Sequence, residues 1–198
     1  VQVVVGNADE SGRRTLQVHS RPDADGDDSR PWTTHATGAL TADSPSTDGA
    51  TNLTAWPPAG ASEVELAGVY ERLAEQEYAY GPAFQGLRRV WKGADEGELF
   101  AEVSLADEQR TDAERFQLHP ALLDSALHLL LPGVVDEDRA AVLPFTWAGV
   151  SVHAVGASVL RVRLTQTGPE SVALDLADAT GAPVATVESM AYRPLSKD

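Results

Sequence analysis

Cysteine is absent from this sequence, and so are long apolar runs. Zero cysteines among 198 residues exclude disulfide bonds, thiolate metal ligands and a cysteine nucleophile. No stretch approaches the roughly 20 consecutive apolar residues that a membrane-spanning helix needs. Hydrophobic residues nevertheless form 42% of the chain, which is enough for one sizeable core. We therefore expect a soluble globular protein.

Positive charge is also scarce. Lysine and arginine number 15 against 30 acidic residues, and the formal net charge of -15 makes a nucleic acid an unfavourable partner. The first residues, VQVVVG, show neither an initiator methionine nor the basic start of a secretory signal. They resemble a strand already under way, so we expect the natural beginning to lie upstream and the location to be the cytoplasm.

The first 62 residues are expected to hold short strands and a linker. Residues 15–20 and 32–40 carry the β-branched and aromatic side chains that strands favour, with a turn-forming acidic loop between them. Residues 43–62 are rich in Ser, Thr, Pro, Gly and Ala and show no sustained period, which is typical of a linker. Trp56 is expected to hold this linker on a protein surface.

The rest of the chain predicts an antiparallel sheet around one helix. Residues 63–77 place Leu66, Val69, Tyr70 and Leu73 at helical spacing, which favours an amphipathic helix. Residues 87–105 read as two strands joined by a turn, and further strands follow between 151 and 194. A conspicuously apolar helix is expected over 120–131. This arrangement predicts the α+β class.

The helix predicted over 120–131 carries a narrow polar strip. Asp124, Ser125 and His128 share one arc, while leucine and alanine fill the remainder. A solvent-exposed Asp/His pair four residues apart is one account, and it contributes only about 0.2–0.5 kcal/mol. A lined cavity is the other, because the strip lacks the long charged side chains of the chain's other polar faces. In a cavity, desolvation favours the protonated carboxyl group, which makes Asp124 a candidate general acid.

Two other stretches are candidates for the site. Tyr78 and Tyr80 offer hydroxyl donors just before the turn-forming pair Gly81-Pro82. Phe145 and Trp147 could wall a tunnel for an acyl chain. Packing in the core is the alternative for each stretch.

The chain resembles the C-terminal portion of the dehydratase domains of modular (type I) polyketide synthases. The resemblance covers essentially the whole sequence. Four ordered blocks carry this resemblance, at residues 78–84, 119–124 together with His128, 143–147 and 152–194. One departure is Glu77, where the family usually has glycine, and we expect it to have little effect.

The resemblance implies a double hotdog, in which two units each wrap a long helix in an antiparallel sheet. Residues 1–42 would close the first hotdog, 43–62 would be the linker and 63–198 would form the second. The family removes water from a β-hydroxyacyl chain held as a thioester on the phosphopantetheine arm of an acyl carrier protein, without a metal or redox cofactor. The implied partners are that carrier and neighbouring synthase domains. Family members often dimerise, and the sequence leaves the oligomeric state open.

The resemblance also assigns residues to roles. Asp124 is the implied acid, which suits a reaction whose leaving hydroxide must be protonated as it departs. His128 would orient the acid or the leaving hydroxyl group, and Tyr80 would donate a hydrogen bond there. The residues expected to bind substrate are Tyr78, Gly81, Pro82, Phe84, Leu123, Pro144, Phe145 and Trp147.

The family's general base, a histidine in the pattern H-x-x-x-G-x-x-x-x-P, matches none of the five histidines. We therefore expect the base to lie upstream and this chain alone to be inactive, because residues that act as a unit are strongly non-additive. A hotdog thioesterase, a cyclase, a double-bond isomerase and an inactive structural domain remain alternatives. Carrier proteins are usually acidic, so the basic cluster Arg88, Arg89 and Lys92 is a candidate docking patch, with a solvated strand face as the alternative. Arg161 and Arg163, whose spacing of two places them on one strand face, are a weaker candidate.

Overall fold

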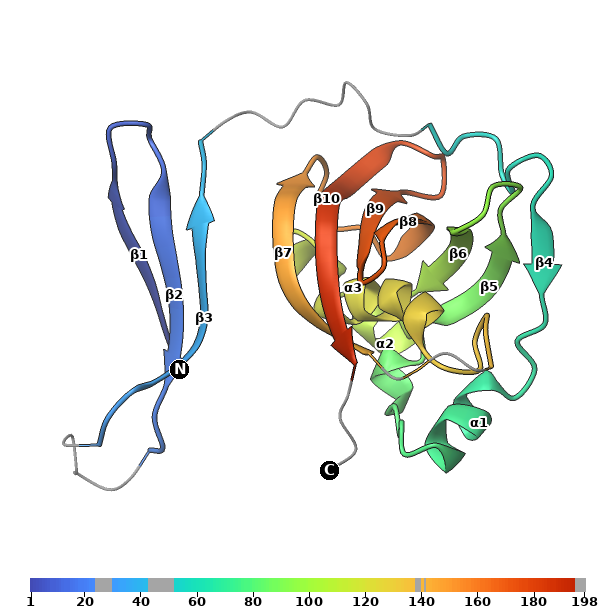
Figure 1. The fold of residues 1–198 in the computed structure, drawn as a ribbon, viewed down its shortest axis with the longest axis horizontal. Helices are drawn as coiled ribbons and strands as arrows, with labels where there is room; N and C mark the ends of the chain where they lie inside the picture. The colour runs from blue at the N-terminus through green and yellow to red at the C-terminus, as the bar shows by residue number, and fades with distance from the viewer. Residues whose placement is uncertain (24–29, 43–51, 138–139, 141, 195–198) are drawn as a thin grey trace. The chain divides into compact units, whose positions relative to one another are not determined.

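The chain divides into two units, Val1–Ser44 (unit 1) and Pro45–Asp198 (unit 2). A computed structural model describes residues 1–23, 30–42, 52–137, 140 and 142–194 (Figure 1). Within this part of the chain, no helix is both long and apolar enough to cross a membrane. The predicted boundaries at residues 42 and 62 remain predictions.

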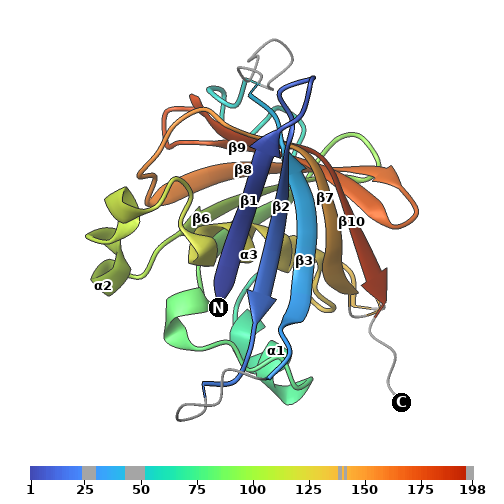
Figure 2. The same cartoon turned by 90° about the vertical axis from the view of Figure 1, so that its left-hand side faces the viewer.

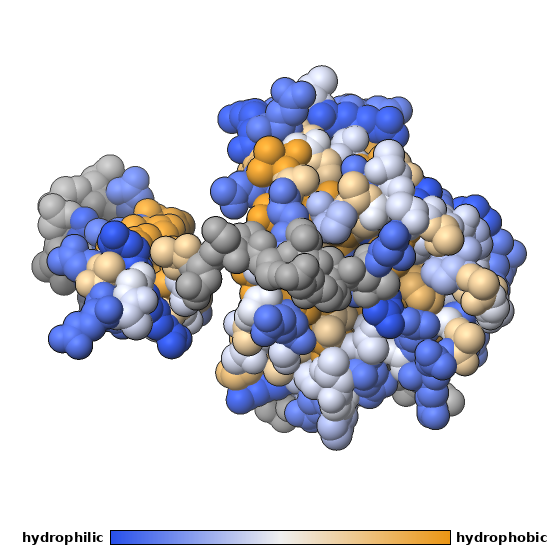
Figure 3. Space-filling view, turned by 90° about the horizontal axis from the view of Figure 1, so that it is seen from above, coloured by the Kyte–Doolittle hydropathy of each residue, from blue (hydrophilic) through white to orange (hydrophobic). Residues whose placement is uncertain are grey.

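Unit 1 is a three-stranded antiparallel sheet made of β1 (Gln2–Ala8), β2 (Arg14–Ser20) and β3 (Thr33–Leu40) in that order (Figure 2). The strands predicted over 15–20 and 32–40 are confirmed, while residues 24–29 of the predicted loop lie outside the described part. The register pairs Val3 with Val18 and Val5 with Leu16, so these side chains share one apolar face. None of the described residues of unit 1 is buried, and Figure 3 shows hydrophobic side chains at its surface.

Unit 2 contains a seven-stranded sheet in which every neighbouring pair is antiparallel. The strands run in the order β4-β5-β6-β8-β9-β10-β7, so β7 and the short β4 form the two edges. The strands are β4 (Ser62–Val64), β5 (Leu87–Lys92), β6 (Glu98–Ser104), β7 (Val142–Val152), β8 (Val159–Gly168), β9 (Ser171–Ala177) and β10 (Pro183–Pro194). The chain turns at residues 169–170 between β8 and β9, and at residues 178–182 between β9 and β10.

Alternation along the strands separates the core from the outer face of this sheet. On β8, Leu160, Val162 and Leu164 are buried, whereas Arg161 and Arg163 lie between them. Arg163 binds Glu98 across the outer face with a 2.6 Å contact. The predicted pairing of the two arginines on one strand face is therefore confirmed.

The sheet wraps around α3 (Pro120–Leu127), which packs against β6 and β8 (Figure 1). Pro120 occupies the first turn, and the His119 Nδ1 atom accepts a hydrogen bond from the Ala121 amide at 3.2 Å. The α-helix ends four residues before the predicted Leu131, and His128–Leu130 forms a 3₁₀ turn instead. The physical reason is Pro132, which disfavours helical backbone in the residue before it, and Leu131 is extended.

The helix predicted over 63–77 is wrong over residues 63–68. Residues Ser62–Val64 form β4 and pair with β5, and α1 occupies only Val69–Glu75. Gly68, at the N-cap, has a left-handed backbone with φ of 66°, which a helix cannot continue through. Two shorter helical segments, α2 (Asp107–Arg110) and a 3₁₀ turn at Ala113–Arg115, precede α3.

The segment before β4 packs on the outer face of the sheet through Leu53 and Trp56. The Trp56 indole packs edge-on against Trp91 and Phe100, with ring centroids 5.5 and 5.9 Å apart. Its Nε1–H donates to Glu102 Oε1 at 2.6 Å. The expectation that Trp56 holds this segment on a surface is confirmed, while residues 43–51 of the predicted linker lie outside the described part.

Candidate active site

The polar strip of α3 runs from the core to the surface. The His128 Nε2 and Asp124 Oδ2 atoms are 3.1 Å apart, one helical turn from each other. The side chain of His128 is 1% exposed, whereas that of Asp124 is 40% exposed. A solvent-exposed pair is therefore the wrong account of His128, because its imidazole is buried and its partners have to come from the protein.

Tyr70 of α1 is the second partner of His128. Its Oη atom lies 3.1 Å from the His128 Nδ1 atom and accepts a hydrogen bond from the Leu87 amide at 2.9 Å. Burial raises the pKa of Tyr70 to about 12, so the phenol stays protonated at neutral pH. A single chain of hydrogen bonds thus joins the start of β5 to Asp124.

Tyr80 lies against the other side of the imidazole. The ring centroids of Tyr80 and His128 are 4.3 Å apart, with the planes tilted by 51°. Burial raises the pKa of Tyr80 to about 12, and the nearby Asp124 charge contributes to the shift. The structure therefore brings together the three predicted catalytic residues, and it presents Tyr80 as a neutral hydroxyl donor.

The loop that carries Tyr80 is held close to α3. Gly81 precedes a 3₁₀ turn at Pro82–Phe84, and the Gln85 side-chain amide donates to the Tyr80 carbonyl oxygen at 2.8 Å. A Cβ atom at Gly86 would overlap the Ser125 hydroxyl group and lie 2.9 Å from the Ser104 carbonyl oxygen. Only glycine permits this close approach, and the sequence interpretation did not single it out.

The residues predicted to bind substrate fall into two groups. Tyr78 and Leu123 are partly buried against the core near the hydrogen-bonded chain, and Phe84 is 40% exposed at the end of its turn. Pro144, Phe145 and Trp147 lie instead on the edge strand β7. There, the Arg193 guanidinium group covers the Phe145 ring at 3.5 Å. The substrate-binding role of both groups remains a prediction.

Sequence reasoning missed Tyr70 as a site residue because its spacing fits the apolar face of α1. A usable signal was nevertheless present, since a buried tyrosine normally has a hydrogen-bond partner for its hydroxyl group. Those partners are 17 and 58 residues away along the chain, so spacing could not identify them.

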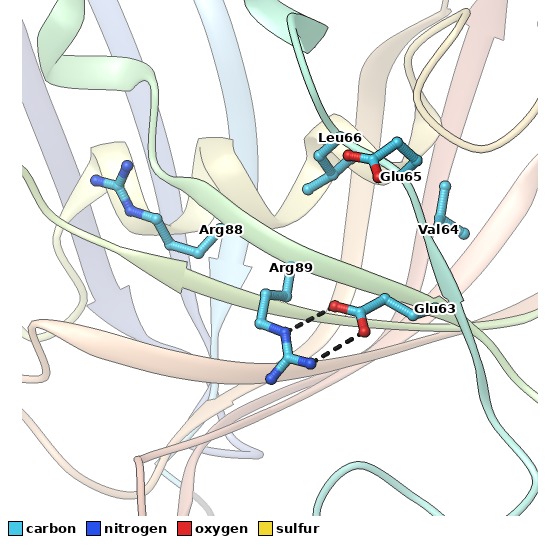
Figure 4. A pocket seen from close by; sticks show the side chains of 6 residues that line it. All are labelled: Glu63, Val64, Glu65, Leu66, Arg88 and Arg89. Carbon is cyan, nitrogen blue, oxygen red and sulfur yellow. Dashed lines mark hydrogen bonds and ion pairs between the residues drawn. The ribbon is translucent and has the colours of Figure 1, made fainter.

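Two of the three basic residues in the predicted docking cluster, Arg88 and Arg89, make hydrogen bonds within the protein. Arg89 binds both carboxylate oxygens of Glu63, at 2.8 and 3.1 Å, on the wall of a groove of about 340 Å³ (Figure 4). This hydrogen bonding lowers the pKa of Glu63. Arg88 points away from that pair, and its Nε–H donates to Ser104 Oγ at 2.7 Å. Glu63 therefore compensates one of the three charges expected to meet a carrier.

A seven-stranded antiparallel sheet around a short helix defines an α+β hotdog unit, and the contact between the buried His128 and the half-exposed Asp124 marks its candidate site. Residues 48–198 match the model of a protein family described as "Polyketide synthase dehydratase N-terminal domain". The chain belongs to this dehydratase family. Polyketide synthase GfsA from Streptomyces halstedii is 50% identical over 202 residues, covering 100% of this chain and 3% of that protein.

Solved structures show the same relationship. A structure from work on dehydratase substrate selection in the borrelidin and fluvirucin polyketide synthases is 45% identical with a TM-score of 0.84. The match covers 98% of this chain and 66% of that one. The bifunctional dehydratase-cyclase domain in ambruticin biosynthesis is 37% identical with a TM-score of 0.79, over 96% of this chain and 67% of that one. The chain thus spans about two thirds of these dehydratase structures.

Proposed function

We propose that this chain supplies the acid half of a dehydratase that converts a β-hydroxyacyl thioester on an acyl carrier protein to the α,β-unsaturated thioester. The observation that supports this most directly is the hydrogen-bonded chain ending at Asp124, next to the neutral phenol of Tyr80. The general base is a histidine upstream of this sequence, because none of the five histidines here fits the family pattern.

In the proposed reaction, the base removes a proton from the carbon next to the thioester carbonyl group. The C–O bond to the β-hydroxyl group breaks, and Asp124 gives its proton to the departing oxygen, so one water molecule leaves. Negative charge then develops on the Asp124 carboxylate. The His128 Nε2 atom is 3.1 Å from Oδ2 and can donate to that charge as it forms. Tyr80 donates to the substrate hydroxyl group.

The reaction takes place in the cytoplasm, beside neighbouring synthase domains, and needs no metal or redox cofactor. The substrate arrives on the phosphopantetheine arm of an acidic carrier. With Arg89 engaged by Glu63, we assign the carrier contact to Arg88 and Lys92.

The test uses the complete domain, including the upstream segment, with a β-hydroxyacyl group on its carrier. Asp124→Asn should lower turnover by about 100-fold or more without changing the thermal midpoint. Asp112→Asn is the matched control, because Asp112 pairs with Arg115 in an exposed ion pair. Full activity in Asp124→Asn would remove this residue as the acid. The 198-residue chain alone should give no turnover.

The similarity to a dehydratase-cyclase favours a second candidate, in which dehydration is followed by ring closure. A substrate with a second hydroxyl group would then give a product with the mass of the enoyl thioester but without its conjugated absorbance. A thioesterase would release the free acid instead, so mass and absorbance together separate the three activities.

A further inference from the structure

The polar groups of the candidate site form one continuous chain, and the proposed reaction uses only its outer half. In order from the interior, the Leu87 amide meets Tyr70 Oη at 2.9 Å, Oη meets His128 Nδ1 at 3.1 Å, and His128 Nε2 meets Asp124 Oδ2 at 3.1 Å. The inner half contains the partly buried phenol of Tyr70 and the Nδ1 atom of the buried imidazole. Its arrangement determines which proton each group holds.

The inner end of the chain favours one direction for its hydrogen bonds. A backbone amide can only donate, so Tyr70 Oη accepts from Leu87 and has its own single hydrogen left for another acceptor. Burial keeps that phenol protonated, since the pKa of Tyr70 is raised to about 12. The atom that faces it is His128 Nδ1. An imidazole that accepts at Nδ1 carries its proton on Nε2 when neutral.

We propose that Tyr70 is a positioning residue that holds His128 in its Nε2–H tautomer, so that His128 donates to Asp124 but cannot take its proton. This inference rests on the proposed role of Asp124 as the acid. In the opposite tautomer, an unprotonated Nε2 would lie 3.1 Å from the carboxyl group and would compete with the substrate for its proton. With Tyr70 in place, the chain occupies both imidazole nitrogens.

A consequence concerns the two oxygens of Asp124. The Oδ2 atom accepts from His128, so the proton that passes to the leaving hydroxyl group resides on Oδ1. Tyr70 thus acts through His128 and contacts neither the acid nor the substrate. Its removal should change the rate of the chemical step more than substrate binding.

The tautomer can be read by ¹⁵N NMR of the 198-residue chain labelled at histidine. His128 is assigned by the signals lost in His128→Gln, and in its neutral form it should show an unprotonated Nδ1 and a protonated Nε2. His119 is an internal reference, because its Nδ1 accepts from the Ala121 amide at 3.2 Å. A protonated Nδ1 in neutral His128 would overturn the assignment.

The variant Tyr70→Phe should shift the His128 Nδ1 signal because the hydroxyl group that faces this nitrogen at 3.1 Å is removed. Tyr192→Phe is the matched control, since it removes the hydroxyl that donates to the Pro169 carbonyl oxygen at 3.2 Å in the same unit. Both variants lose a partly buried hydrogen bond and some stability, but only the first should move the His128 signal. An equal shift in both variants would overturn the inference.

In the complete domain, Tyr70→Phe should lower kcat by about tenfold or more and leave KM within about twofold. In a His128→Gln background, the same change should have little further effect, because an amide at this position has no tautomer to select. Independent, multiplicative losses would overturn the positioning role. A complete domain that dehydrates no thioester would refute the proposed function, whereas the NMR experiment needs no turnover and still decides the tautomer.

Discussion

Unit 1 and unit 2 are both built from antiparallel strands, yet they bury very different amounts of their apolar surface. In unit 1, Val3 and Val5 are 61% and 50% exposed, although they share a face with other apolar side chains. In unit 2, Val162 and Val172 are fully buried. The physical difference is α3, which covers the inner face of the larger sheet, whereas the described part of unit 1 contains no helix.

The comparison shows that strand alternation produces an apolar face but not a core. A sheet becomes stable when a second layer removes that face from water. The same requirement governs the chemistry, because a buried imidazole with two hydrogen-bond partners can exist only where there is an interior. The whole chain from Leu87 to Asp124 accordingly lies in unit 2.

Amide hydrogen exchange of the 198-residue chain should show the largest contrast between the units. Amides of the central strands β8 and β9 should exchange at least about a thousandfold more slowly than those of β1 to β3, relative to their unstructured rates. The physical reason is that opening β8 or β9 exposes the core of unit 2. Equal protection in both units, measured by mass spectrometry, would show that the face of unit 1 is covered.

Much of this fold could be predicted from the sequence, because the period of apolar residues is a local property. Most strands of both units and the helix after Pro120 follow from it. Two strands were not predicted: β4 lies where a helix was expected, and β7 begins at Val142, before the strands expected from residue 151 on. The ends of the helices could not be predicted from this period, because single residues determine them. Gly68 delays α1 and Pro132 stops α3, against a periodicity that continues past both points.

The part of the candidate site that depends on local spacing could also be predicted from the sequence. Asp124 and His128 are one turn apart on a helix, so their contact follows from spacing. Tyr70 contacts His128 only through tertiary packing, and the requirement for glycine at position 86 arises from the approach of a separate helix. Neither relationship has a local pattern in the sequence.

Shortening an apolar side chain should destabilise unit 2 much more than unit 1. Leu122 is fully buried in α3, so Leu122→Ala should lower the free energy of unfolding of unit 2 by about 2–5 kcal/mol. Val4→Ala on β1 should change stability by less than about 0.5 kcal/mol, because Val4 is 38% exposed. Chemical denaturation followed by near-ultraviolet circular dichroism measures both. Similar losses would contradict the contrast in burial.

Replacing a glycine by alanine should also destabilise unit 2 more than unit 1, by a smaller amount than the truncation of Leu122. Gly86→Ala should cost about 1–3 kcal/mol, because its Cβ atom would overlap Ser125 and crowd the Ser104 carbonyl oxygen. Ser125→Ala in the same chain should recover part of that loss. Gly38→Ala on β3 is the control in unit 1, where nothing lies within 4 Å of the added atom. A Gly86→Ala chain as stable as the unmodified protein would disprove the close approach.

High pH should weaken unit 2 selectively, because all four tyrosines lie in that unit. The pKa of Tyr70 and of Tyr80 is raised to about 12 in the folded state, above the unfolded value near 10. Their contribution to stability is therefore complete below pH 10 and is lost as the pH rises toward 12. Denaturation midpoints across this range should fall, and less steeply in Tyr80→Phe. Ionisation of Tyr70 and Tyr80 near pH 10 would contradict these shifts.

Glu77 stands where the family usually has glycine. Replacing it by glycine should have a small effect, and it is the substitution expected to raise the stability of unit 2. Glu77 has a backbone φ of 72°, a left-handed conformation that disfavours any residue with a Cβ atom, and it follows the C-terminal end of α1. Glu77→Gly should therefore stabilise unit 2 by about 1 kcal/mol, measured by chemical denaturation. Glu75→Gly, at the last residue of the helix, should destabilise unit 2 by about 0.5 kcal/mol, because there glycine loses backbone freedom without relieving strain. Opposite signs from the same substitution, glutamate to glycine, would separate local backbone strain from the burial that distinguishes the two units. A loss of stability in both variants would contradict the strain at Glu77.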